Sequence, residues 1–202
     1  MTASSGSDGY TPEMSDGSTV TSEPPWVREV LDFWFSELQK VDWWAKSEAT
    51  DATIRERFVA LHERLAAGDG ADLNQCDSLL AAVIVLDQFS RHLFRNSPRA
   101  YASDPLARRL ARKAIARGCD SGMRDDERMF LYLPFEHSED RTDQSFSVEL
   151  FGRLGHESWT RDALAHKSLI DRFGRFPHRN SVLGRKSTPE EIAALAEPGG
   201  SF

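Results

Sequence analysis

The chain has 202 residues, of which 40% are apolar and 28% charged, values typical of one soluble globular domain. Its formal net charge of −7 argues against partners that need a basic protein, namely nucleic acid and anionic membranes. The longest apolar run, Leu79 to Leu86, is too short to span a bilayer. We therefore expect a soluble, cytoplasmic protein.

The N-terminal residues differ in composition from the rest. Residues 1–25 are rich in Ser, Thr, Gly, Asp and Pro and carry four acidic and no basic side chains. This composition predicts a disordered acidic tail over 1–25, followed by a single all-α domain over 26–202. The N-terminus has no basic start and no apolar run, so we expect no signal peptide. Cys76 and Cys119 have neither metal-site nor redox-motif spacing and are expected to be reduced.

Apolar residues recur at helical spacing along the chain. They predict helices over residues 27–38, 50–67, 77–94 and 104–118. A further helix is predicted to begin near residue 125, to be interrupted at Pro134 and to be followed by a helical segment that ends at residue 154. The last two predicted helices span residues 158–173 and begin after Thr188, respectively. Asp104 and Ser158 are expected to cap their helices, and Gly68 and Gly174 to end theirs. Thr188-Pro189-Glu190-Glu191 has the pattern of a capping box.

No segment alternates apolar and polar residues with a period of two. The predicted fold is therefore all-α, with seven to nine helices in antiparallel pairs that form a tetratricopeptide-like helical array.

The most distinctive stretch is residues 170–185, IDRFGRFPHRNSVLGR. Its four arginines alternate with large apolar residues, which suggests a rigid turn that presents cations in one direction. Residues 166–186 hold six basic side chains and one acidic side chain, a local charge of +5 in an acidic protein. Such a local surplus suits a small anionic ligand better than a polymer.

Two other stretches concentrate polar residues at the end of an apolar helix: residues 87–95, DQFSRHLFR, and residues 137–144, HSEDRTDQ. In each, polar side chains spaced three and four residues apart share a helical face. We expect these two stretches and residues 166–185 to meet around one pocket.

The blocks LDQFSRHLFR, FLYLPFEHSED…DQ and H…IDRFGRFPHRNSVLGRKSTPEE resemble the signature blocks of the bacterial domain-of-unknown-function family DUF924, over about residues 26–195. The resemblance implies an all-α, tetratricopeptide-like architecture and no established activity, substrate or cofactor. Ser90 departs from the family block, which has proline at that position, so the backbone near Arg91 is expected to differ.

These observations give a site hypothesis for a small anionic metabolite. Arginine supplies fixed hydrogen-bond donors to phosphate or carboxylate, and histidine can move protons near neutral pH. The candidate ligand-binding residues are Gln88, Arg91, Arg95, His166, Arg172, Arg175, Arg179 and Asn180. The candidate catalytic residues are His137, His178, Glu139 and Asp140, with the two carboxylates orienting the imidazoles or acting as base. The same residues would serve equally well as a structural lock of Arg–carboxylate pairs between helix ends.

Three other interpretations remain open. His137, His166 and His178 with Glu139 or Asp140 could ligate a metal, but their spacing fits no known ligand set, and we expect no metal and no cofactor. A helical-repeat adaptor for a peptide or protein partner, with purely structural polar clusters, is the main alternative function. Nucleic-acid binding ranks last because no known motif is present.

Overall fold

The computed structural model describes residue 1, residues 23–70 and residues 73–197. The described residues form helices and no strands, which confirms the all-α class. The α-helical segments are α1 (Pro25–Asp32), α2 (Glu48–Arg64), α3 (Cys76–Ile84), α4 (Ser90–Leu93), α5 (Arg99–Ala102), α6 (Asp104–Ala116), α7 (Asp125–Glu136), α8 (Arg141–Leu154), α9 (Glu157–Phe173) and α10 (Pro189–Leu195). Most of the predicted acidic tail, residues 2–22, lies outside the described residues.

Short π-helical segments adjoin three of these helices, and the segment after α2 is kinked at Gly68, where φ is 116°. They are η1 (Phe33–Glu37) after α1, η2 (Leu65–Asp69) after α2, and η3 (Val85–Phe89) between α3 and α4. With these rods counted as single helices and the one-turn α5 left out, the described residues contain eight helices, within the expected seven to nine.

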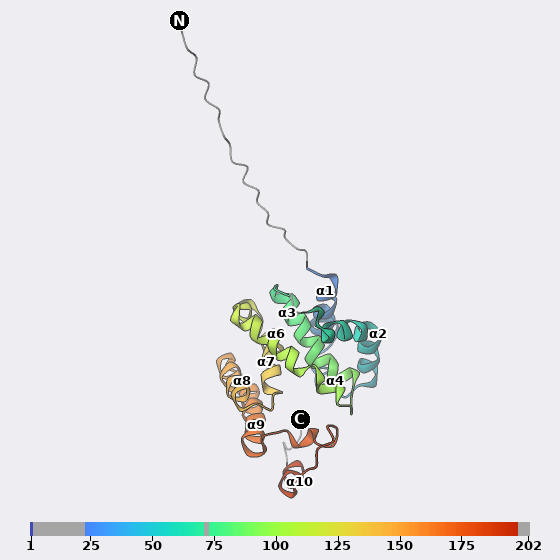
Figure 1. Ribbon diagram of the computed structural model, residues 1–202, viewed down its shortest axis with the longest axis vertical. Coiled ribbons are helices and arrows are strands. Elements are labelled where there is room, and N and C mark those ends of the chain that lie inside the picture. The colour runs from blue at the N-terminus through green and yellow to red at the C-terminus, as the bar shows by residue number, and fades with distance from the viewer. Residues whose placement is uncertain (2–22, 71–72, 198–202) are drawn as a thin grey trace.

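The rod α3–η3–α4 is the centre of the domain (Figure 1). Every side chain from Leu79 to Phe89 is buried, and α1, α2, α6 and α7 all pack against this rod. A helix that is apolar on all sides must be surrounded by others, so the central position follows from the sequence. The polar end of the same rod, from Asp87 onward, points toward the C-terminal part of the chain.

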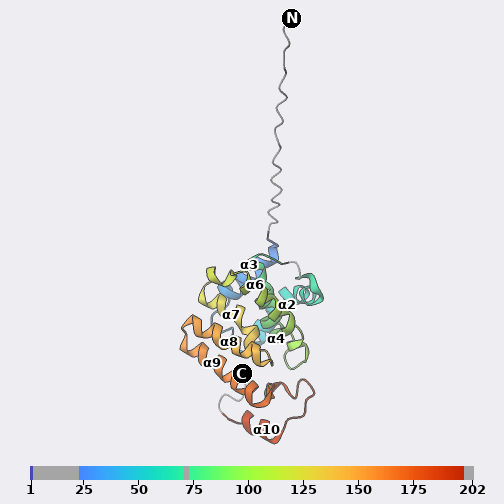
Figure 2. The same ribbon diagram turned by 60° about the vertical axis from the view of Figure 1, so that its left-hand side comes forward.

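The C-terminal helices lie at one end of the molecule. α8 and α9 pack side by side, and α10 lies beyond them in both ribbon views (Figures 1 and 2). Gly174 ends α9 with a φ of 68°, a left-handed conformation that glycine adopts without strain. The short 3₁₀ helix η5 (Pro177–Arg179) follows and turns the chain back toward the central rod.

Several helix ends differ from the prediction. Ser103 and His156, and not Asp104 and Ser158, are the residues that precede α6 and α9. The Asp104 carboxylate is engaged by arginine instead, which explains why it makes no cap. Pro134 lies inside α7, which runs on to Glu136. The capping box at Thr188 is confirmed, since Thr188 and Glu191 each bond the other's backbone nitrogen.

The cysteine prediction is wrong. Cys76, at the start of α3, and Cys119, in the short 3₁₀ helix η4 (Cys119–Gly122) after α6, form a disulfide across 43 residues of chain. The two residues have no motif spacing, because folding and not sequence proximity brings the two helix ends together. In the part of the chain that is described, no helix is both long and apolar enough to cross a membrane.

Ser90 is compatible with an unbroken rod. Its hydroxyl oxygen lies 2.7 Å from the carbonyl oxygen of Leu86, and η3 passes directly into α4 at this residue. A serine in a helix often satisfies its hydroxyl on a carbonyl one turn earlier, so no proline-type break occurs before Arg91.

Candidate functional site

The three polar stretches meet at the end of the central rod, around the buried carboxylate of Asp87. Its Oδ1 lies 2.9 Å from Nδ1 of His137 at the end of α7 and 3.4 Å from Nη1 of Arg91 one helical turn away. Gln88 donates to its other oxygen. Burial alone would raise the pKa of Asp87, but Arg91 and His137 hold it well below its usual range. Asp87 is therefore an anion, and His137 donates its Nδ1 proton to it.

Two arginines flank a second buried carboxylate, Asp104 at the start of α6. Arg91 donates to both Asp104 oxygens, at 3.0 and 3.2 Å, and to the Asp87 carbonyl at 2.6 Å. Nη1 of Arg179, from η5, lies 3.5 Å from an oxygen of the same carboxylate. The bidentate contact of Arg91 with Asp104 is the strongest geometry for a guanidinium–carboxylate pair.

Arg179 is a buried cation whose hydrogen-bond donors are incompletely used. It is only 6% exposed, and its guanidinium lies over the rings of Tyr101 and Phe176, 4.5 and 4.6 Å from their centres. Within the described residues, no acceptor meets its Nε. Burial lowers the pKa of Arg179, and the nearby Arg91 lowers it further. A buried guanidinium normally uses its donors fully, so this arrangement has unused capacity for an acceptor.

Glu136 and His166 form a second buried acid–imidazole pair. The His166 Nδ1 donates to the carbonyl of Asp162 at 2.9 Å and lies 3.1 Å from Glu136 Oε1. Burial raises the pKa of Glu136 to about 8, and the acidic Asp162 and Asp87 add to this effect. Burial lowers the pKa of His166 to about 3. At neutral pH the pair is therefore a carboxylic acid beside a neutral imidazole and not an ion pair.

Three imidazoles line this region. The rings of His137 and His166 are 6.4 Å apart, and Phe176 lies 5.7 Å from His166 and 5.5 Å from His178. Burial lowers the pKa of His137, and burial together with Arg179 lowers that of His178 to about 4. All three are neutral near pH 7, and each could take up a proton if a negative charge arrived.

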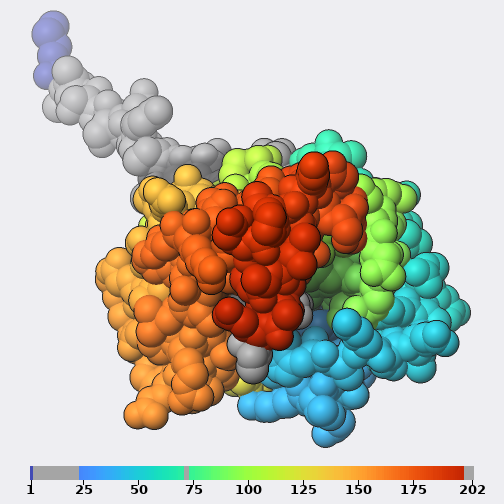
Figure 3. Space-filling view, turned by 90° about the horizontal axis from the view of Figure 1, so that it is seen from below, coloured from blue at the N-terminus to red at the C-terminus, as the bar shows by residue number. Residues whose placement is uncertain are grey.

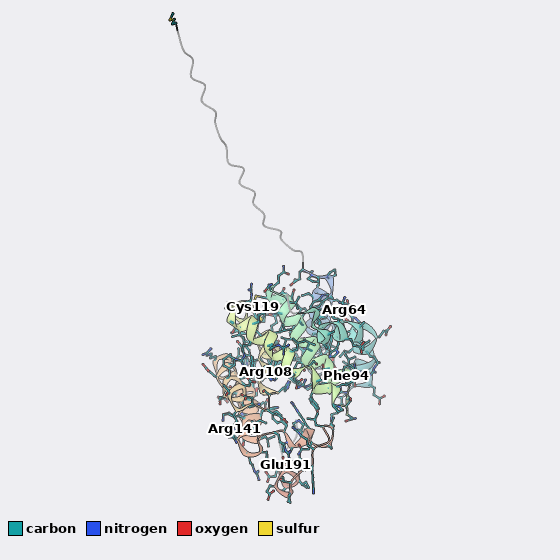
Figure 4. The ribbon with its side chains drawn as sticks, in the orientation of Figure 1. Arg64, Phe94, Arg108, Cys119, Arg141 and Glu191 are labelled. Carbon is teal, nitrogen blue, oxygen red and sulfur yellow. A yellow bond between two sulfur atoms is a disulfide. The ribbon has the colours of Figure 1, made fainter. Side chains whose placement is uncertain are left out.

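The other predicted ligand-binding residues lie in separate contacts. Arg95 pairs with Asp51 on α2, where Nη2 is 2.8 Å from Oδ1. Arg175 donates hydrogen bonds to both oxygens of Glu191 on α10, at 2.6 and 2.9 Å, and Asn180 donates to the same carboxylate at 3.1 Å. Arg172 is exposed, with its guanidinium over the ring of the adjacent Phe173. Figure 4 shows Glu191 at the C-terminal end of the molecule.

Glu139 and Asp140 have partners other than the imidazoles that we expected them to orient. Glu139 accepts from Arg185 at 2.7 and 2.9 Å and from the backbone of Phe176 at 2.8 Å, so it holds the C-terminal segment in place. Asp140 caps α8 by accepting from two backbone nitrogens. The carboxyl groups that contact the predicted site imidazoles His137 and His166 are Asp87 and Glu136.

Glu136 and Asp104 are the residues that sequence reasoning missed as members of the cluster. Glu136 follows the apolar run FLYLPF, and an acidic residue at the end of so apolar a helix is a signal of a buried titratable group. The pattern Asp104-Pro105 predicts a helix cap, and nothing in the sequence near Asp104 indicates its contacts with Arg91 and Arg179. Among the described residues, no three His, Cys, Asp or Glu side chains are placed to hold a metal ion.

The space-filling view shows the surface nearby. The face seen in Figure 3 is hollowed between the C-terminal segment, in red, and the green segment near residue 100. These are the two segments that carry Arg179 and Tyr101.

With this geometry established, the chain can be compared with known proteins. It matches the model of a family of bacterial proteins of unknown function, DUF924, over residues 30–199. The chain belongs to the DUF924 family. It is also similar to the solved structure of ATU0120, a protein of unknown function from Agrobacterium tumefaciens, with 39% identity and a TM-score of 0.81. The match covers 86% of this chain and 98% of that one. No curated protein matches the chain.

These similarities establish the family and the fold of this DUF924 protein but name no ligand or reaction. The chemistry of the site therefore depends on the contacts described above. The site places the carboxylates of Asp87 and Asp104 beside the guanidiniums of the partly exposed Arg91 and the buried Arg179, with neutral Glu136 and neutral imidazoles around them.

Proposed function

We propose that this DUF924 protein binds a small anion, a carboxylate or a phosphate ester, at Arg179. The observation that carries the proposal is that Arg179 is buried, has no acceptor for Nε within the described residues, and shares with Arg91 the Asp104 carboxylate that lies 3.5 Å from it. An oxygen anion beside Nε would complete the guanidinium's hydrogen bonds and offset the cost of its burial.

Arg91 and the imidazoles would complete the receptor. Arg91 is held by Asp87 and Asp104, so it contributes positive potential without changing position. His137, His166 and His178 would donate hydrogen bonds to the ligand or take up a proton to match its charge. The predicted acid–base roles of His137, His178, Glu139 and Asp140 concern a later chemical step and stay predictions.

A thermal-shift panel of carboxylates and phosphorylated metabolites at pH 6 tests the proposal. We expect at least one anion to raise the melting temperature of the wild type and of Arg172→Met, which removes an exposed arginine five residues before the start of η5. The same anion should not stabilise Arg179→Met. A panel without a stabilising anion, or an Arg179→Met variant stabilised as strongly as the wild type, would contradict the proposal.

The second candidate function is a helical adaptor for a peptide or protein. Its support is that Arg95, Arg175 and Arg185 are already paired with carboxylates, as a structural lock requires. It also depends on the tetratricopeptide-like pairing of helices, which stays a proposal. Partner capture that survives Arg179→Met and is lost on substitution of the exposed Trp44 would favour the adaptor.

The cytoplasmic location also stays a proposal. The Cys76–Cys119 disulfide weighs against it, because reducing compartments rarely maintain disulfides. Alkylation of thiols in intact cells before lysis would decide the point, since a reduced pair takes up the label and an oxidised pair does not.

A further inference from the structure

A second site lies on a different part of the molecule, against α2, α5 and α6. A cavity of about 360 Å³ opens there to solvent. It is lined by His62, Glu63, Ala66, Phe94, Arg99, Ala102, Ser103 and Leu106. Phe94 lies well apart from Arg141 and Glu191, which mark the C-terminal helices in Figure 4. None of the lining residues is one of the residues described around Arg179, namely Asp87, Arg91, Tyr101, Asp104, Glu136, His137, His166, Phe176 and His178.

The inner wall of the cavity contains a chain of short polar contacts. Nε2 of His62 is 2.6 Å from the hydroxyl of Ser90, and this hydroxyl is 2.6 Å from that of Ser103. Both hydroxyl oxygens lie 2.7 Å from the carbonyl of Leu86. These groups come from α2, from the central rod and from the residue before α6, so three separate helices hold the chain of contacts in place.

The short contacts around His62 indicate which ring nitrogen carries the proton. Burial lowers the pKa of His62, and Arg99 lowers it further, so the ring is neutral and carries one N–H. With that proton on Nε2, a directional chain runs from Nε2 to Ser90, from Ser90 to Ser103 and from Ser103 to the Leu86 carbonyl. With the proton on Nδ1 instead, only the two hydroxyl protons remain for the same four short contacts. The first arrangement satisfies more of them.

This assignment leaves Nδ1 of His62 as an acceptor. His62 is 5% exposed, and no group in the described part of the chain donates to Nδ1. An acceptor this deeply buried loses its hydrogen bonds to water without replacing them. A donor that enters the cavity beside the ring would restore one.

The rest of the cavity favours an uncharged, partly apolar molecule. Ala66, Phe94, Ala102 and Leu106 supply apolar wall. The charged residues at the rim, Arg99 and Glu63, pair with each other at 3.2 Å, and both are more than half exposed. Arg99 also lies 3.9 Å above the ring of Phe94. The site therefore offers no unpaired charge to an ion, and a cavity of about 150 Å³ already holds one benzene ring.

We propose that this cavity binds a small uncharged molecule with an apolar body of about one ring and an O–H or N–H group that donates to the His62–Ser103 wall. The proposal is independent of anion binding at Arg179, since the two sites share no residue.

Phenol and anisole provide a matched pair of probes, because both place an oxygen on one aromatic ring and only phenol donates a hydrogen bond. Each is titrated into the ¹⁵N-labelled full chain while the imidazole nitrogen signals are followed. We expect phenol to bind about fivefold more tightly than anisole, the factor typical of one neutral hydrogen bond, and to shift the Nδ1 signal of His62. His62→Phe keeps an aromatic ring in the wall and should bind both probes equally.

Equal affinities of the wild type for the two probes would overturn the proposal, as would absence of binding or phenol binding that leaves the His62 signals unmoved. If His62→Phe does not fold, the affinities of the wild type for phenol and anisole still test the proposal. A starting spectrum with the proton on Nδ1 would also overturn it, because the acceptor would then be missing.

Discussion

Replacement of Glu136 by Gln should make the protein less sensitive to alkaline pH. Glutamine keeps the shape of the protonated side chain but cannot ionise. Glu136 is buried among apolar neighbours on α7, and its pKa is raised to about 8, mainly by burial. In the unfolded chain it returns to an ordinary value near 4.5. The native state therefore binds more protons than the unfolded state between these two pH values, so stability falls as pH rises through that window.

The size of the effect follows from the two pKa values. The difference of roughly 3.5 units, at about 1.4 kcal/mol per unit, gives about 5 kcal/mol as an upper bound above pH 8. Below pH 4.5 the group is protonated in both states and contributes nothing to the pH dependence. The free energy of unfolding of the wild type should thus fall, relative to Glu136→Gln, by about 3 to 5 kcal/mol between pH 4.5 and pH 8.5.

Urea unfolding of both proteins across this range measures the difference, and subtraction removes the titration of all other groups. Glu149→Gln, which removes an exposed carboxylate on α8, is the matched control for the loss of one surface charge. A wild-type minus Glu136→Gln difference that is constant with pH would refute the reasoning. It would show that Glu136 ionises in the native state at its ordinary pKa.

Three further predictions follow from the same contacts. Reduction of the Cys76–Cys119 disulfide should lower the free energy of unfolding by about 4 kcal/mol, because the unfolded chain regains the entropy of a closed loop of 43 residues. Urea unfolding with and without reductant measures the change, and a change below about 1 kcal/mol would contradict this prediction. Arg175→Met should speed limited proteolysis after residue 185, because it releases Glu191 and α10, whereas Arg172→Met should not; equal rates would be inconsistent with the anchoring role. The affinity of the Arg179 site for an anion should rise as pH falls from 8 to 5. A bound anion raises the low pKa values of His178 and His166 and so favours proton uptake by these imidazoles. Calorimetric titrations of the anion that show no pH dependence would exclude the imidazoles from the site.

The sequence predicts much of this fold because helical periodicity is a local property. The rod from Cys76 to Leu93 is apolar on all sides in its first half, and this pattern alone places it at the centre. The capping box at Thr188 is equally local and equally predictable. The Cys76–Cys119 bond is not, since it depends on where two helix ends lie in space.

The site was predictable only in outline. Polar residues at the ends of apolar helices indicated the three stretches that meet, but their pairings are set by distances across the fold. Arg95 and Arg175 belong to the same stretches as Arg91 and Arg179, yet each finds a carboxylate on another helix. Periodicity predicts on which face of its helix a side chain lies, but it does not predict which residue of another helix lies opposite. For that reason Arg179 could not be distinguished in advance from the other arginines.

The central claim is that Arg179 holds an unused donor for an anion, and the Nε–H signal of its guanidinium in a ¹⁵N NMR titration tests this most directly. On addition of a stabilising carboxylate or phosphate ester at pH 6, we predict that the Arg179 Nε–H signal shifts as a new hydrogen bond forms, whereas that of Arg175, already bound to Glu191, stays in place. An Arg179 signal that does not respond to any anion while the protein remains folded would contradict the account.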